Sequence, residues 1–140
     1  MDEVIPISIA GSEGVIFPAA FVFRHLDSVG EAWTPTTEQV VNAEQKLPAY
    51  LATATPRLPT SVRPGAAERI SMRLDHYVRQ YLGVSRAGRR FMYINCLPAD
   101  HHSDWRTRPL FVMDGGESFF HLLYDPELGE FSELSINGEA

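Results

Sequence analysis

The stretch that decides the fold is YVRQYLGVSRAGRRFMYINCL, which occupies residues 77–97. Its first half alternates with a period of two, which is typical of a β-strand. One face carries Tyr77, Arg79 and Tyr81, and the other carries Val78, Gln80 and Leu82. Ser85–Gly88 ends in glycine, which suits the left-handed position of a hairpin loop. We therefore predict a β-hairpin in which 91–97 returns as the second strand.

Further strands are predicted downstream of this hairpin. The segment 98–109 is polar and interrupts pairing, and 110–113 resumes it. Asp114-Gly115-Gly116 then turns the chain into a strand over 118–124. In Asp125-Pro126-Glu127-Leu128-Gly129, proline presets φ and glycine accepts a positive φ, so this pentapeptide predicts a turn. The last strand is expected over 131–136, which makes the C-terminal half an antiparallel meander.

The segment upstream of the hairpin predicts helices. Thr34-Pro35 has the residues of a helix start, with threonine as N-cap and proline at the first helical position. An apolar stripe with helical spacing follows, formed by Val40, Ala43, Leu47, Tyr50 and Leu51. Pro48 lacks an amide donor, so we expect the helix to kink or end there. A short second helix is predicted over 66–75.

The N-terminal segment 4–23 is compatible with a hairpin. Val4–Ala10 alternates, and Pro6 would confine it to a sheet edge. Gly11–Gly14 is expected to turn, and Val15–Phe23 to return. Residues 53–65 form a proline-rich internal loop. We therefore predict one domain over 1–140 of class α+β, with a four- to five-stranded antiparallel sheet packed by the N-terminal helix. A cystatin-like or nuclear-transport-factor-like curved sheet is the nearest analogy.

Several motifs together resemble a group of small bacterial proteins that has no known activity. They are His76–Gly83, Gly88, Tyr93-Ile94-Asn95, Trp105, Asp114-Gly115-Gly116 with Phe119-Phe120, and Asn137–Ala140. The Thr-Pro-x-x-Glu start and Leu47-Pro48-x-Tyr50-Leu51 are also similar. The resemblance covers roughly the last three-quarters of the chain and implies no activity, cofactor or ligand. Many members of the group are exported or lipid-anchored.

Composition disfavours some classes of function. The formal charge of −6 is unfavourable for binding nucleic acid, and the Arg86, Arg89 and Arg90 cluster lies at a predicted hairpin tip. Val15–Phe23 is too short to span a bilayer. The chain as given is expected to be cytoplasmic, whereas an export leader upstream of it would place the protein in the periplasm or envelope. Cys96 lies in an apolar run and is expected to be a small buried side chain.

No residues point to a metal, a cofactor or a catalytic nucleophile. His101, His102 and Asp104 are metal-capable, but adjacent loop histidines do not readily face one ion. Arg79 on a strand beside Tyr81 could bind a carboxylate or pair with a structural acid such as Glu133. His121 within a strand could serve as a base or as a hydrogen-bonded structural residue.

Two functions are compatible with these features. The first is a non-catalytic protein-binding domain, such as a bacterial inhibitor or immunity protein, whose acidic surface suits a basic partner. Trp105 is its candidate anchor, unless that side chain plugs one end of the sheet. The alternative is a small-molecule-binding protein or enzyme, with a pocket between helix and sheet lined by Arg79, Tyr81, Tyr93 and His121. A homodimer is compatible with both.

Overall fold

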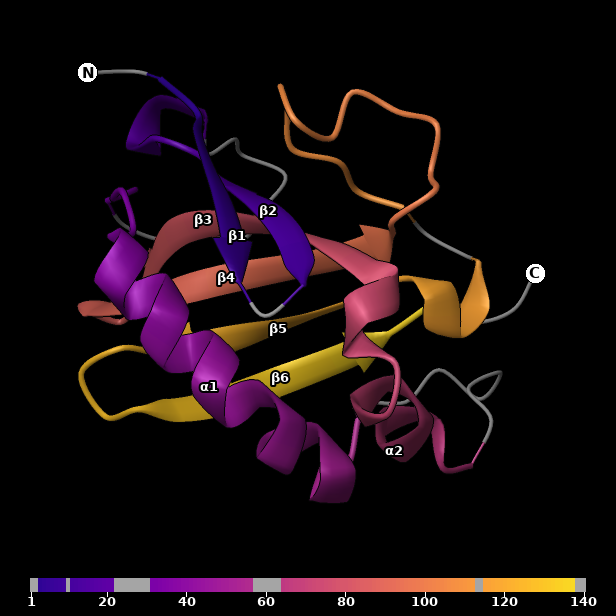
Figure 1. Cartoon of the computed structure of the whole chain (residues 1–140). Coiled ribbons are helices and arrows are strands. Elements are labelled where there is room, and N and C mark those ends of the chain that lie inside the picture. Colours follow the sequence, from indigo (N-terminus) through magenta and orange to yellow (C-terminus); the bar gives the residue numbers. More distant parts are fainter. Residues whose placement is uncertain (1–2, 10, 22–30, 57–63, 113–114, 138–140) are drawn as a thin grey trace.

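A computed structural model describes residues 3–9, 11–21, 31–56, 64–112 and 115–137 of the chain. The protein is α+β, with one open sheet whose strands lie in the order β1-β2-β3-β4-β5-β6. A long helix, α1 (Thr37–Thr53), crosses one face of this sheet (Figure 1). The strands are β1 (Ile5–Ile9), β2 (Ser12–Ile16), β3 (Tyr77–Arg86), β4 (Arg89–Pro98), β5 (Phe120–Asp125) and β6 (Glu130–Ile136).

The hairpin predicted from residues 77–97 is confirmed. Strands β3 and β4 pair in antiparallel register from Tyr77 opposite Pro98 to Arg86 opposite Arg89. The connecting residues Ala87 and Gly88 have φ angles of 50° and 78°, so both adopt the left-handed conformation that tight hairpin turns require. Strands β5 and β6 extend the antiparallel meander, and Gly129 closes their turn with φ of 69° and a 2.7 Å bond from its amide to Asp125 O.

The sheet has six strands rather than four or five because the N-terminal segment joins it. Strands β1 and β2 pair in antiparallel register, and β2 then pairs with β3 in parallel. The predicted turn over 11–14 is wrong, since Ser12–Gly14 already belong to β2. Strand β2 also ends at Ile16, and a 3-10 turn follows at Ala19–Phe21 (η1). Pro6 does lie on an edge strand, as predicted.

Helix α1 starts two residues later than predicted. Its N-cap is Thr36, whose hydroxyl accepts from the amide of Gln39, while the Gln39 side chain accepts from the amide of Thr36. This reciprocal capping box satisfies two amide donors and so defines the start better than Thr34-Pro35. The Thr34 hydroxyl accepts from the amide of Ala19 instead. The helix also continues past Pro48, with Leu51 buried one turn later.

The segment before β5 corrects two expectations. Residues 110–112 form no strand, because the backbone of Leu110 is bonded to side chains: its amide donates to Gln80 Oε1, and its carbonyl accepts from Asn95 Nδ2. Ser118 belongs to a 3-10 turn, η3 (Gly116–Ser118), so β5 begins only at Phe120. The second helix is likewise shorter than predicted: α2 spans Ala66–Ser71, and a separate 3-10 turn, η2 (Leu74–His76), leads into β3.

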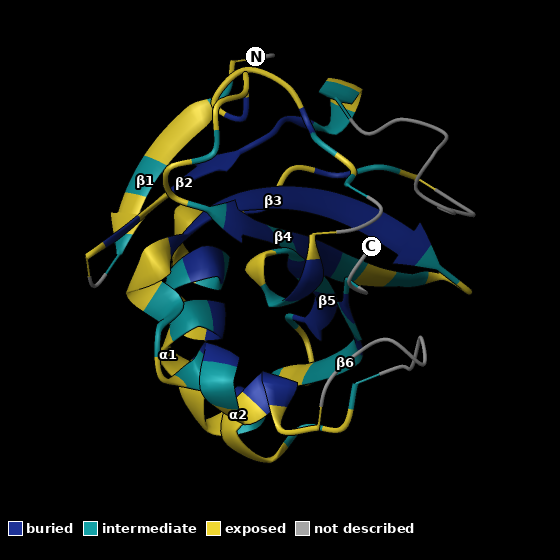
Figure 2. Cartoon of the chain, turned by 90° about the vertical axis from the view of Figure 1, so that its right-hand side faces the viewer, coloured by how far each residue is buried: buried dark blue, intermediate teal, exposed yellow. Residues whose placement is uncertain are grey.

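Each face of the sheet carries its own apolar cluster. The α1 side buries the helix stripe against Tyr81, Met92, Ile94, Leu122 and Leu134, among others. The opposite side, called here the outer face, packs Val78, Leu82, Tyr93 and Leu123 under Trp105 and Phe17. Burial on both faces explains why β3 is almost entirely buried, whereas β1 is largely exposed (Figure 2).

Candidate functional site

The sheet separates the four residues that the sequence nominated as ligand contacts. Arg79 and Tyr81 lie on the α1 side, where they contact Glu44 of α1. Arg79 donates to the Glu44 carboxylate at 3.1 and 3.2 Å, and the Tyr81 hydroxyl donates to it at 2.7 Å. Burial of its phenol raises the pKa of Tyr81 well above the ordinary value. The structural acid of Arg79 is therefore Glu44, and Glu133 pairs with Arg86 instead.

Tyr93 and His121 lie together on the outer face. Their rings are stacked, with centroids 5.0 Å apart and an angle of 23° between the planes. Phe111 packs beside Tyr93 at 6.3 Å between ring centroids. The register places His121 opposite Asn95. This pair is thus brought together, but on the side of the sheet away from Arg79 and Tyr81.

Trp105 is not an exposed anchor. The residue is only 2% exposed and packs into the outer-face cluster, so it covers one part of the sheet. The guanidinium of Arg106 lies 4.3 Å from its ring centroid and shields it further.

A buried glutamine anchors the loop that carries Trp105. Gln80 donates through its Nε2 to the carbonyls of Trp105 and Arg108, both at 2.8 Å. Its Oε1 accepts from Asn95 Nδ2 at 2.9 Å and from the amide of Leu110 at 3.0 Å. All four hydrogen-bonding positions of the amide are thus used, which makes Gln80 a structural residue that fixes the loop over the outer face.

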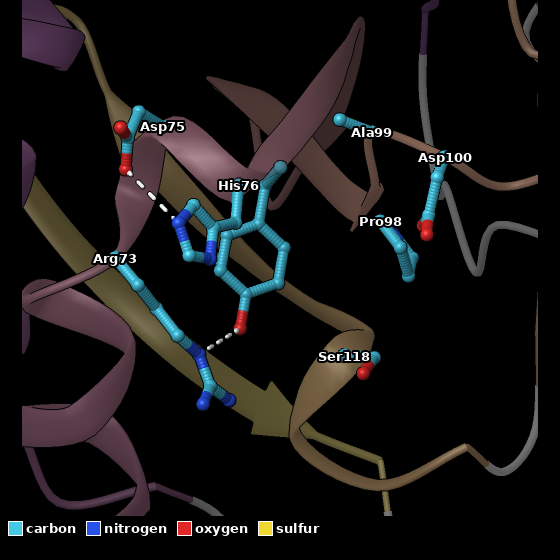
Figure 3. Close-up of a pocket in the computed structure, with 8 residues that line it drawn as sticks. Arg73, Asp75, His76, Pro98, Ala99, Asp100 and Ser118 are labelled. Carbon is cyan, nitrogen blue, oxygen red and sulfur yellow. Dashed lines mark hydrogen bonds and ion pairs between the residues drawn. The ribbon is translucent and has the colours of Figure 1, made fainter.

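A hollow of about 490 Å³ lies at the end of the sheet where β3 begins and β4 ends. We call it the η2 hollow, and its lining is Arg73, Asp75, His76, Tyr77, Pro98, Ala99, Asp100 and Ser118. Figure 3 shows His76 on one side of the view and Pro98, Ala99 and Asp100 on the other, with the ring of Tyr77, whose hydroxyl Arg73 contacts, between them. Two hydrogen bonds fix its walls: Ala99 donates to His76 O at 2.9 Å, and His101 donates to Pro98 O at 3.0 Å.

Arg73, which lines the hollow, is bound by an acid on η3. Its Nη2 lies 3.4 Å from Glu117 Oε1, and its Nε donates to the Tyr77 hydroxyl at 3.3 Å. Arg69 holds the same Glu117 carboxylate with two bonds, of 2.9 and 2.6 Å. Tyr77 in turn donates to the carbonyl of Glu117 at 2.6 Å, and burial raises the pKa of its phenol. These contacts link α2, η2 and η3 into one rigid wall.

The acidic side chains of the hollow remain exposed. Asp75 is 69% exposed, and its Oδ1 lies 3.9 Å from Nε2 of His76, which is 70% exposed. Asp100 is exposed and has no ion pair or hydrogen bond with any residue in the described ranges. Both carboxylates are therefore accessible to a ligand from solution.

A second, shallower hollow continues along the loop of residues 99–108. It shares Ala99 and Asp100 with the η2 hollow and adds His101, His102, Asp104 and Arg108. Nδ1 of His101 forms a hydrogen bond of 2.8 Å with Ser103 Oγ, and Oδ2 of Asp104 lies 3.8 Å from Nε of Arg108. Among the residues that the structure describes, no three His, Cys, Asp or Glu side chains form a metal-binding group.

Cys96 is buried on the α1 side of β4, as predicted. Burial raises the pKa of its thiol to about 12, while the nearby Arg79 lowers it. A thiol with this pKa is fully protonated at neutral pH, so Cys96 lacks the thiolate that nucleophilic catalysis requires.

The sequence reasoning missed the η2 hollow. Its residues come from three separate segments, 73–77, 98–100 and Ser118, and only pairing of β3 with β4 and packing of η3 bring them together. The one local signal was the change from a helical to a strand pattern near Asp75, which indicates a turn at the end of the sheet.

Comparison of the chain with known protein families, curated proteins and solved structures gives no match. No helix in the described part of the chain has the length and apolarity to cross a membrane.

Proposed function

We propose that the chain is a non-catalytic domain that binds another protein, as a bacterial inhibitor or immunity protein does. The observation that carries this proposal is the position of Met72. Met72 is 81% exposed, and the next residue, Arg73, lines the η2 hollow. An isolated exposed apolar residue is ordinary, but a methionine that directly precedes a residue of a concave hollow is a candidate contact for a partner, since methionine is enriched at protein interfaces.

The surface around Met72 offers the contacts that protein interfaces use. Methionine adapts its shape to an apolar partner surface. The 99–108 loop, which borders the η2 hollow at Ala99 and Asp100, adds histidine, aspartate and arginine side chains. The net charge of −6 favours association with a basic partner and raises its rate of encounter. A helix packed on an antiparallel meander is also analogous to the cystatin-like and nuclear-transport-factor-like architectures, and this likeness enters the proposal as analogy only.

The test compares two exposed apolar residues at opposite ends of the sheet. Leu128 is 60% exposed in the β5–β6 turn, away from α2 and η2 (Figure 1). A partner captured from the native host is purified, and its affinity is measured by calorimetry for the wild type, Met72→Ser and Leu128→Ser. We expect Met72→Ser to weaken binding at least tenfold and Leu128→Ser less than twofold. Equal affinities for all three proteins would overturn the proposal.

A second candidate, a small-molecule-binding protein or enzyme, is favoured by the volume of the η2 hollow. A hollow of about 490 Å³ is within the range of ligand sites. Its position differs from the predicted pocket, because it lies at the sheet end rather than between helix and sheet. A thermal-shift screen of metabolites, repeated with Asp100→Asn, tests it: a stabilising compound whose effect requires Asp100 would favour this candidate.

A further inference from the structure

We infer that the free edge of β1 binds an extended segment of the partner, which pairs with it as an additional strand of the sheet. This inference rests on the proposed function and specifies the conformation of the segment that is recognised. Its basis is the direction of the backbone groups of β1, together with the surfaces that lie on either side of this strand.

The ladder between β2 and β3 fixes which backbone groups of β1 face away from the sheet. The amide of Phe17, which directly follows β2, donates to Tyr81 O at 3.0 Å. Because backbone groups alternate in direction along a strand, the odd-numbered residues of β2 face β3 and its even-numbered residues face β1. The even-numbered residues lie opposite the three isoleucines of β1. The backbone groups of Pro6 and Ser8 therefore point outward.

These outward groups are open to the backbone of another chain. Strand β1 pairs with β2 alone, and Figure 2 shows it as a mostly exposed strand at the border of the sheet. The backbone of Pro6 and Ser8 forms no hydrogen bond with any other residue in the described part of the chain. Ser8 presents an amide and a carbonyl, while Pro6 presents only a carbonyl. An extended strand has donors and acceptors with the spacing of this row.

The opposite edge of the sheet is less suited to strand addition. The register of β6 with β5 shifts between His121 and Leu123, and Glu133 within β6 has a φ of 52°. An irregularity of this kind bends and twists an edge strand, so the regular row of donors and acceptors is interrupted.

Both sides of β1 offer a surface to the side chains of an added strand. On the α1 side, Ile5 is 41% exposed, and Ile7 and Ile9 are half-buried against the core cluster. On the outer face, a groove of about 440 Å³ is lined by residues of β1 and β2 together with Trp105 and Arg106. Since the side chains of a strand alternate between two faces, an added strand places its side chains on these two surfaces in turn.

The edge fits a strand of a different protein better than a second copy of this chain. Two-fold pairing of β1 with itself repeats the missing amide hydrogen of Pro6 in both strands, whereas a partner strand meets it once. Two copies also carry a net charge of −6 each and repel, while a basic partner is attracted. Proline on an edge strand is a known device against self-association.

The test follows the Ser8 amide in the complex with the partner purified from the native host. We expect hydrogen exchange at this amide, measured by NMR, to slow roughly tenfold or more in the complex. Light scattering should show the free chain as a monomer. Unchanged exchange at Ser8 in the complex would overturn the inference. A free chain that is a dimer with a protected Ser8 amide would assign the edge to a second copy, which also overturns it.

Two variants at the same position separate the backbone from the side chain. Ser8→Pro removes the outward amide hydrogen and leaves the bonds to β2, which belong to the neighbouring isoleucines. It should weaken binding of the partner roughly tenfold, whereas Ser8→Ala keeps the amide and should change the affinity less than about twofold. Circular dichroism checks that both variants are folded, and if Ser8→Pro is not, exchange at Ser8 in the wild type decides. Equal affinities for two folded variants would contradict the inference.

Failure of this inference is distinguishable from failure of the proposed function. If Met72→Ser weakens binding of the partner but Ser8→Pro does not, the domain binds a protein without strand addition. If neither variant weakens binding, both the strand addition and the proposed interface are wrong.

Discussion

The carboxylate of Glu44 on α1 and the guanidinium of Arg79 on β3 form an ion pair that is almost completely removed from solvent. Their side chains are 7% and 3% exposed, and Nε of Arg79 lies 3.1 Å from Oε2 of Glu44. Arg79 also donates to the carbonyls of Leu74 and Tyr77, at 2.9 and 2.8 Å. A buried pair is stable only when its remaining donors and acceptors are satisfied in this way. The pair joins helix to sheet and holds the turn that leads to the η2 hollow.

Glu44→Gln is therefore expected to lower the free energy of unfolding by about 3 kcal/mol, because it leaves the Arg79 charge buried without its counter-ion. Urea unfolding followed by fluorescence measures the change. Glu38→Gln serves as the control, since Glu38 lies in the exposed first turn of the same helix and should cost less than about 1 kcal/mol. Equal losses in both variants would show that the pair contributes nothing particular to stability.

Cys96 should make stability fall at alkaline pH. The pKa of its thiol is about 12 in the folded chain and is near 9.0 when exposed, so between these values the unfolded chain releases a proton that the folded chain retains. The contribution is complete below pH 9 and decreases above it, by at most about 1.4 kcal/mol per pH unit.

The measurement is the unfolding free energy of the wild type and of Cys96→Ala at pH 8.5, 9.5 and 10.5, roughly spanning the start of that window. Ionising tyrosines contribute to both proteins, so the difference between the two slopes isolates the thiol. We expect the wild type to lose stability more steeply with rising pH. Parallel slopes would contradict burial of the thiol.

Gly83 has no room for a side chain. A Cβ at this position would clash with the carbonyl oxygen of Trp33. Trp33 forms an isolated β-bridge with Gly83, and its indole N–H donates to Val84 O at 2.7 Å. Gly83→Ala should therefore cost about 3 kcal/mol and shift the indole N–H resonance of Trp33. Gly88→Asn, at a left-handed turn position with open space around it, should cost less than about 1 kcal/mol. A tolerated alanine at 83 would mean that Trp33 does not pack there.

Gln80→Leu should loosen the loop of residues 99–110, which borders the η2 hollow. The substitution removes the hydrogen-bond partners of the Trp105 and Arg108 carbonyls and of the Leu110 amide. Each buried group left without a partner costs about 1–3 kcal/mol of stability. Hydrogen exchange of the Leu110 amide should accelerate at least tenfold, while exchange of the Ile94 amide in the middle of β4 should change only with global stability. Unchanged protection of Leu110 would show that the loop is held by packing alone.

Much of the sheet could be predicted from local chemistry. The alternation in 77–97 and the turn residues Gly88 and Gly129 define β3–β6, since strand periodicity and positive φ depend on only a few neighbouring residues. The parallel contact of β2 with β3 could not be predicted, because it joins Gly14 to Arg79 across more than sixty residues and has no local signal.

The candidate site was harder to predict because strand alternation fixes the face of a residue only relative to its own strand. Arg79 and Tyr93 are close in sequence and both suited to ligands, yet the register places them on opposite faces. The start of α1 could not be predicted from the residue types alone either, because two threonines close together both suit an N-cap. Thr-x-x-Gln was present beside Thr34-Pro35, and the two side-chain bonds of the capping box decided between the alternatives.

The most direct measurement of the central claim is site-specific photocrosslinking in the native host. A photoreactive amino acid is placed at position 72, at position 102 in the loop, or at position 128 in the β5–β6 turn, and the covalent products are resolved by mass and identified. The proposal predicts one shared partner for positions 72 and 102 and none for position 128. Crosslinks to that partner from position 128 alone, or no product from position 72, would contradict it.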